Sequence, residues 1–160
     1  MLKLKSLAVM LLIFLTISGD LFADISDKEE ALAFASFIQD LVHTTQTTKP
    51  GALCFMGSDE VSRIMSQEKS FIDLDREMSK FNSCKAIYIA AGVQKGIGPE
   101  TIKFNKNKIM TIAIFDGFTE SGGMIQVQMG RRSFELILNA KVAKDSGVRL
   151  SALSTSLIIN

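Results

Sequence analysis

Two cysteines, Cys54 and Cys84, are the residues whose types and spacing point most directly to a chemistry. Their separation is far from the C-x-x-C spacing of zinc and redox sites. The single histidine, His43, lies in a polar stretch without a nearby ligand pair, so no metal site is expected. In an oxidising compartment the two cysteines are a candidate disulfide, and two separate buried thiols are the alternative.

A bridge between these cysteines would matter to a small domain. On the chain-entropy estimate, closing a loop of about thirty residues stabilises a fold by ~3.5 kcal/mol. That is a large share of the whole stability of such a domain.

Side chains that could catalyse a reaction are scattered along the chain. No serine lies in a G-x-S-x-G elbow, and Gly96 and Gly98 lack the third glycine of a dinucleotide fingerprint. The acidic pairs Asp59-Glu60 and Asp73–Asp75 fit solvated faces. A hydrolase whose carboxylates meet only in three dimensions is the remaining catalytic alternative. The sequence therefore predicts a protein that is not an enzyme, with no catalytic residue and no cofactor.

Residues 1–23 have the pattern of a secretory signal peptide. Two lysines precede the apolar run Leu7–Ile17, whose length of about 11 residues falls short of the roughly 20 that cross a membrane. We expect cleavage within a few residues of Ala23, which leaves an exported domain over residues 24–160. An uncleaved amphipathic anchor is the alternative.

The charges of the exported domain are balanced. The whole chain has 18 lysines and arginines and 17 acidic residues, and residues 1–23 hold two of the lysines and one aspartate. The remainder is therefore neutral, without the cationic excess of nucleic-acid-binding proteins. The adjacent Arg131 and Arg132 fit an exposed hairpin turn, so nucleic acid is excluded as a partner.

Predicted strands and helices alternate along the domain. An amphipathic helix is expected over 26–43, opened by a capping box between Ser26 and Glu29. Continuous apolar runs predict core strands, and two alternating segments predict a β-hairpin. The core strands are expected over 52–56, 84–90 and 109–115, and the hairpin strands over 124–129 and 133–138.

Shorter elements complete the pattern. They are helices from Asp59 and at Pro99, a weak extended segment over 70–74, and short helices over 140–146 and 152–159. Asn139 can cap the helix over 140–146, and Gly147 fits its end. The prediction is an α/β fold in a single domain, with a mixed β-sheet, flanking helices, and a C-terminal β-hairpin plus short helices.

The pair Gly122-Gly123 before Met124 is the most unusual local feature. Two glycines entering a strand imply backbone angles or a close approach that a Cβ would obstruct. Taken alone, the pair fits a tight loop at the start of a hairpin.

Together with its neighbours, the glycine pair resembles the YfiR-like periplasmic family. The resemblance rests on Asp116-Gly117-Phe118, followed by Gly122-Gly123-Met124 and by Asn139. Other similar segments, in order and at compatible spacing, are Phe34–Phe37, Leu53–Gly57, Cys84–Ile89 and Ser146–Ser151. The chain departs from the family at Asp40-Leu41, where Trp-Pro is common, and at Leu136–Asn139, which lacks the family's glutamate.

The resemblance implies a regulator. The best-known family member holds an inner-membrane diguanylate cyclase inactive by binding its periplasmic part. For this chain the resemblance implies repression of a membrane signalling protein that controls cyclic di-GMP and biofilm growth, with a homodimer as a further possible assembly. It also implies a structural disulfide, Cys54–Cys84. The motif residues that could bind the partner are Phe118, Gly122, Gly123, Met124 and Asn139.

A second hypothesis comes from a different functional class. The chain could be a periplasmic small-molecule sensor or carrier that serves a sensor kinase or an outer-membrane receptor. Its cleft would lie at the strand ends near Gly57 and Gly117, where α/β proteins commonly bind ligands.

Overall fold

Seven strands form one mixed sheet in the computed structural model, which describes residues 18–45, 47, 49–93, 97–129, 133–149 and 156–159. The strand order is β2-β1-β3-β4-β5-β6-β7. The first five strands in this order are parallel, β6 is antiparallel to β5, and β7 is parallel to β6. The strands are β1 (Ala52–Met56), β2 (Ile72–Asp73), β3 (Cys84–Ile89), β4 (Met110–Ala113), β5 (Ile125–Met129), β6 (Phe134–Leu138) and β7 (Ser156–Ile159).

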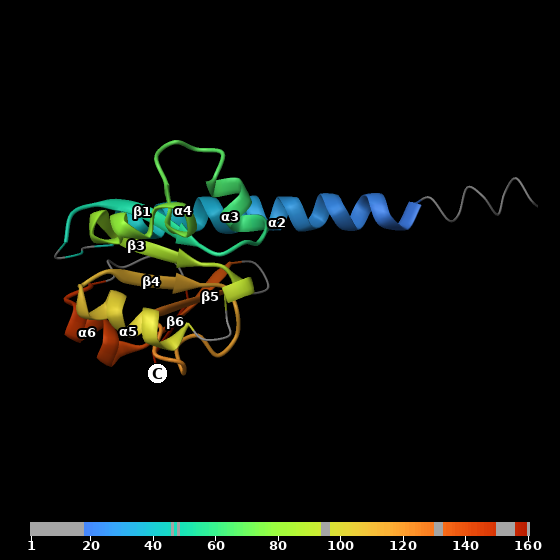
Figure 1. Cartoon of the computed structure of the whole chain (residues 1–160). Helices are drawn as coiled ribbons and strands as arrows, with labels where there is room; N and C mark the ends of the chain where they lie inside the picture. Colours follow the sequence, from blue (N-terminus) through green and yellow to red (C-terminus); the bar gives the residue numbers. More distant parts are fainter. Residues whose placement is uncertain are drawn as a thin grey trace, which may run out of the picture.

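Helices cover both faces of the sheet (Figure 1). One face packs against α2 (Ser18–Thr44) and α3 (Glu60–Met65). The other packs against α4 (Leu74–Glu77), the 3-10 helix η1 (Met78–Ser83) and α5 (Gly98–Lys106). A second 3-10 helix, η2 (Ala91–Val93), follows β3, and α6 (Ala140–Ser146) lies beside α5. The mixed α/β fold expected from the sequence is thus confirmed.

The central strands are buried on both faces. In β3, Ala86 and Tyr88 belong to the core on the α2 side, whereas Ile87 and Ile89 belong to the core on the α5 side. All four side chains are fully buried. Strands covered on both faces carry continuous apolar runs rather than alternating patterns, which is why the sequence revealed them.

The long helix α2 starts earlier than expected. It runs without a break from Ser18 to Thr44, so the helix expected from a cap at Ser26 has the wrong start. No proline lies between Ser18 and Ser26 to stop a helix, and a capping pattern alone does not force one to begin. The first turns of α2 project beyond the sheet (Figure 1). Across the described residues, no helix has both the length and the apolar character needed to cross a membrane.

The last described segment is a strand, where a helix was expected over 152–159. Residues 156–159 form β7, which pairs with β6 in the register Leu136↔Leu157. The expectation is therefore wrong for 156–159, and the preceding residues 152–155 lie outside the described part of the chain. The β-branched residues at the end of β7 favour a strand, and the pairing covers the edge of β6 that a helix would leave open.

The helix α6, between β6 and β7, has the predicted ends. Asn139 Oδ1 accepts a hydrogen bond from the Val142 N–H at 3.1 Å, and Gly147 closes α6 in a left-handed conformation with φ 72°. In contrast, α5 is a nine-residue helix rather than the short turn expected at Pro99. The expected turn at Arg131-Arg132 lies outside the described residues.

A disulfide links the neighbouring strands β1 and β3. It joins Cys54 to Cys84, whose Cα atoms are 5.8 Å apart, and both residues are 0% exposed. The predicted pairing is confirmed. Because solvent does not reach either sulfur, the bridge is a structural link and not an accessible redox switch.

Removal of this bridge should destabilise the fold. We expect the double variant Cys54→Ala/Cys84→Ala to lose ~3–4 kcal/mol of unfolding free energy, because the bridge restricts the unfolded chain. Equilibrium urea unfolding measures the difference. Wild-type protein that is reduced in denaturant and refolded under reducing conditions is the control, because it keeps both sulfurs. Equal unfolding free energies for the oxidised wild type, the reduced wild type and the double alanine variant would contradict the expected role.

Candidate functional site

The connection from β4 to β5 is made by a loop rather than a helix. These parallel neighbours are joined by residues 114–124, all of which are described and none of which is helical. Phe118 packs from this loop into the core on the α5 side of the sheet, fully buried. Phe115 meets it edge-on, with 5.3 Å between ring centroids. The Phe118 ring therefore supplies packing that a crossover helix would otherwise provide.

Phe118 is a core residue, so its side chain is not exposed for a partner to contact in this structure. Its ring lies against Gly123, where an added Cβ would come within 2.3 Å of the Phe118 Cε1 atom. Gly122 has a different reason to be glycine, because its φ of +93° lies in the left-handed region and open space surrounds it. Gly123 thus permits the close approach of the Phe118 ring, and Gly122 permits a left-handed backbone conformation.

Three amide side chains hold this loop in place. The hydrogen bonds run from the Phe118 N–H to Gln126 Oε1 (3.1 Å), from Asn105 Nδ2 to the Gly122 carbonyl (2.9 Å), and from Asn139 Nδ2 to the Thr119 carbonyl (3.1 Å). A buried backbone group left without a partner costs about 1–3 kcal/mol. These amides therefore fix the loop conformation. Gln126 belongs to β5, Asn105 belongs to α5, and Asn139 is the N-cap residue of α6.

Asn139 couples the loop to α6. Besides capping that helix, it donates its backbone N–H to the Met124 carbonyl at 2.9 Å. Met124 is fully buried, and its own N–H donates to Thr111 Oγ1 at 3.0 Å. The structure thus brings five of the residues singled out in the sequence to one place: Phe118, Gly122, Gly123, Met124 and Asn139. The Cys54–Cys84 bridge lies elsewhere, between β1 and β3.

A groove of about 330 Å³ lies between α5 and α6, beside this loop. We call it the α5–α6 groove; its lining residues are Ile102, Asn105, Lys106, Lys108, Gly122, Val142, Asp145 and Ser146. The Ser146 hydroxyl donates to the Asn105 carbonyl at 3.2 Å, which holds the two helices together. The groove is therefore preformed, with apolar and charged side chains side by side.

Sequence reasoning missed the polar residues that shape this site. Gln126 alternates with apolar neighbours along β5, which predicts a solvent-facing side chain, but it is 2% exposed because the loop covers that face. Asn105 is an ordinary helix residue in the sequence and gives no signal. A buried position for Gln126 becomes evident only when the loop is seen to cross over it.

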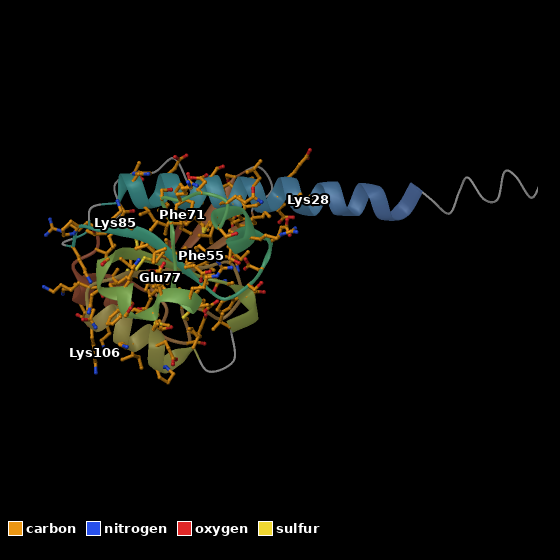
Figure 2. All side chains as sticks on the ribbon, turned by 45° about the horizontal axis from the view of Figure 1, so that its top comes forward. Lys28, Phe55, Phe71, Glu77, Lys85 and Lys106 are labelled. Carbon is orange, nitrogen blue, oxygen red and sulfur yellow. A yellow bond between two sulfur atoms is a disulfide. The ribbon has the colours of Figure 1, made fainter. Side chains whose placement is uncertain are left out.

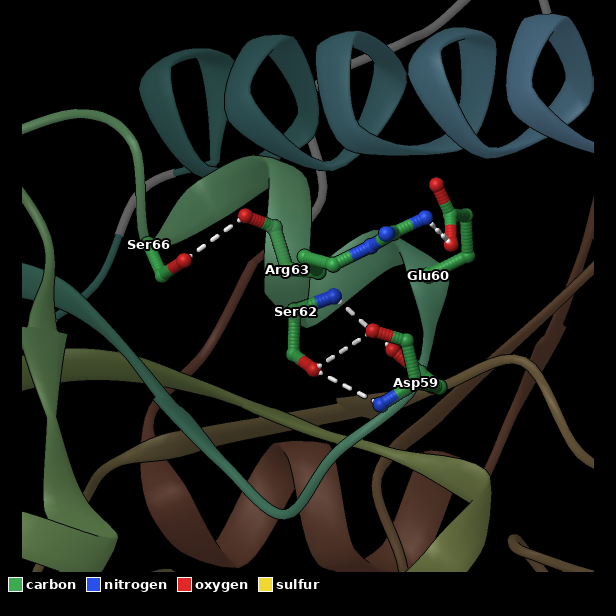
Figure 3. Close-up of polar contacts among 5 residues, drawn as sticks. All are labelled: Asp59, Glu60, Ser62, Arg63 and Ser66. Atoms are coloured by element: carbon green, nitrogen blue, oxygen red, sulfur yellow. Dashed lines mark hydrogen bonds and ion pairs between the residues drawn. The ribbon is translucent and has the colours of Figure 1, made fainter.

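A second cavity lies at the carboxyl end of β1, near Gly57 as the small-molecule hypothesis expects. It has about 340 Å³ and is lined in part by Ser66, Arg63 and Arg76. Many of its polar groups already have partners in the protein. The Gly57 N–H donates to Asp75, and Arg76 pairs with Asp73. Arg63 pairs with Glu60 outside the lining, and the Ser66 hydroxyl donates to the Arg63 carbonyl (Figure 3). These internal bonds engage many of the groups that a ligand would need.

Asp59 ties the ends of β1 and β3 together. Its Oδ2 accepts hydrogen bonds from the Tyr88 hydroxyl at 2.7 Å and from the Ala91 N–H at 3.1 Å. Its Oδ1 accepts from the Ser62 N–H at 2.8 Å and so caps α3 (Figure 3). Asp59 is only half-exposed and has a structural role, which corrects its interpretation as part of a solvated face.

A family model described as YfiR/HmsC-like matches residues 30–153, which include both cysteines, the loop over 114–124 and the α5–α6 groove. No curated protein matches the chain.

The Phe118–Gly123 contact can be tested by adding one methyl group. Gly123→Ala should lower the unfolding free energy by about 1–3 kcal/mol, because the new Cβ overlaps the ring. Urea unfolding measures the loss. Gly98→Ala is the matched control, because the nearest atom to its Cβ is 4.0 Å away and Ala favours the helix α5. Phe118→Leu in the Gly123→Ala background should recover part of the loss, because it removes the ring that the new Cβ overlaps. An unchanged unfolding free energy in Gly123→Ala would refute the contact.

Tyr88 should make the fold sensitive to alkaline pH. Burial, and then the negative charge of Asp59, raises the pKa of Tyr88 above its ordinary value of 10.0. The neutral hydroxyl therefore stabilises the fold fully below about pH 10, and this contribution is lost as the pH rises further. Wild type should lose stability above about pH 10 more steeply than Tyr88→Phe, as measured by urea unfolding across pH. Because Tyr88 is the only tyrosine, tyrosinate absorbance reports its ionisation directly; equal pH slopes in the two proteins would contradict the expectation.

Proposed function

Because the chain belongs to the YfiR/HmsC-like family, we propose that it is a periplasmic protein that binds and represses the periplasmic part of an inner-membrane signalling protein. The repressed protein is a diguanylate cyclase, so the chain lowers cyclic di-GMP and restrains biofilm growth. The family match carries this proposal, because it extends from within α2 to beyond α6 and includes the residues that form the loop and the groove.

The disulfide supports a site of action outside the cytoplasm. Disulfides form and persist in oxidising compartments such as the bacterial periplasm. The Cys54–Cys84 bridge is buried in the core on the α5 side, so the domain gains the stabilisation that the bridge provides only where the bridge can form. The leader pattern in residues 1–23 would deliver the chain to that compartment.

The carboxylates at the strand ends support binding rather than catalysis. Asp59 accepts from Tyr88 and caps α3, and Asp75 accepts from the Gly57 N–H. Asp73 caps α4 by accepting from the Asp75 N–H. Each of these groups therefore has a structural partner that accounts for its presence at the strand ends.

Loss of the chain should raise cyclic di-GMP in the cell. We expect a several-fold rise when the gene is removed and a return to the low level when the full chain is supplied. The matched control is a chain that starts at residue 24, which lacks the leader and stays in the cytoplasm, away from the periplasmic partner. Mass spectrometry of extracted nucleotides measures the levels. Unchanged cyclic di-GMP on removal, or full repression by the leaderless chain, would overturn the proposal.

A further inference from the structure

We propose that the α5–α6 groove receives an acidic segment of a protein partner, which places an apolar side chain against Ile102 and Val142. The proposal deepens the function given above and rests on it, since the partner is the repressed membrane protein. It is carried by two features that meet at this groove, an exposed apolar side chain and an excess of positive charge.

The apolar feature is Ile102. Its side chain is 51% exposed, which is unusual for a large apolar residue, and it lines this groove. Val142 of α6 lies in the same groove and is only half-buried. An apolar side chain of the partner, inserted between the helices, would be buried together with Ile102 and Val142. An apolar side chain held in a pocket of the other protein is typical of a protein interface.

The two helices that form the groove, with the residues that follow them, carry a strongly asymmetric charge. Residues 98–108 and 140–149 contain six lysines and arginines, all exposed, against two acidic residues, Glu100 and Asp145. This small part of the surface thus carries a net charge of +4, whereas the whole chain carries +1. Lys106 and Lys108 line the groove, and the Lys106 side chain extends away from the body of the protein (Figure 2).

Helix ends do not account for this excess. Lysines near helix C-termini offset the negative end of the helix dipole, which is equivalent to about half an elementary charge per helix. The C-termini of α5 and α6 adjoin each other through Ser146 and Asn105. Together they contribute a charge of about −1, and the Lys103 ammonium lies over the Phe81 ring. A net positive charge still remains without a counterpart among the described residues. An acidic partner would supply it.

The shape of the groove favours a protein segment over the other occupants. A bilayer presents a broad surface, and a groove of about 330 Å³ with an apolar side chain inside it suits an inserted side chain better. A two-fold contact between copies through this face would set positive charge against positive charge. The observations therefore select a partner segment with acidic residues around an apolar one.

Two variants of the groove test the proposal in cells that depend on the chain for repression. Ile102→Asp removes the apolar anchor, and Lys106→Glu/Lys108→Glu reverses the charge. Matched controls are Leu32→Asp, at a side chain that is 56% exposed on α2, and Lys69→Glu, in an exposed segment after α3. We expect a several-fold rise in cyclic di-GMP with each groove variant and wild-type levels with both controls, while urea unfolding of the purified proteins stays unchanged.

Full repression by both groove variants, in cells where wild type represses, would overturn the groove proposal and leave the proposed function intact. Absence of repression by wild type would instead overturn the proposed function itself. Two further results would assign the groove to another occupant and overturn the proposal. One is flotation of wild type, but not of Lys106→Glu/Lys108→Glu, with phosphatidylglycerol vesicles. The other is a purified dimer that Ile102→Asp dissociates.

Discussion

The contact between the Phe118 ring and Gly123 is the constraint on which the candidate site depends. Because β4 and β5 are parallel neighbours joined by a loop, this loop must cover the sheet with its own side chains. Phe118 does so only because the residue beside its ring has no Cβ. The loop then takes the path on which Asn105 and Asn139 can bond its carbonyls. The position of α6, and hence the α5–α6 groove, follows from that path.

The opposite part of the sheet acts as a rigid frame. The Cys54–Cys84 bridge joins β1 and β3, and Asp59 joins the segments that follow the same two strands. The bridge is buried and Asp59 is half-buried, and none of the linked residues lines the α5–α6 groove. A surface variant in the groove should therefore leave both links intact, so its effect on the proposed binding can be measured in a folded domain.

The sequence predicted the parts of the fold that depend on local patterns. Apolar runs marked β1 and β3, the cap at Asn139 and the end at Gly147 marked α6, and the cysteine pairing was as expected. Predictions failed where a distant segment decides the outcome. Gln126 is buried because a loop crosses it, and residues 156–159 form a strand because β6 offers an edge. The groove could not be predicted, since Ile102 and Val142 meet only through tertiary packing.

The most direct test of the central claim is photo-cross-linking from the groove in living cells. A photoreactive amino acid replaces Ile102 in the full chain, and in the control it replaces Leu32 on α2. We expect a covalent adduct from position 102 with the periplasmic part of a membrane-bound diguanylate cyclase, through a peptide in which acidic residues flank the attachment point. Position 32 should give no such adduct. Adducts that form at position 32 and not at position 102, or that join position 102 only to a second copy of the chain, would contradict the central claim.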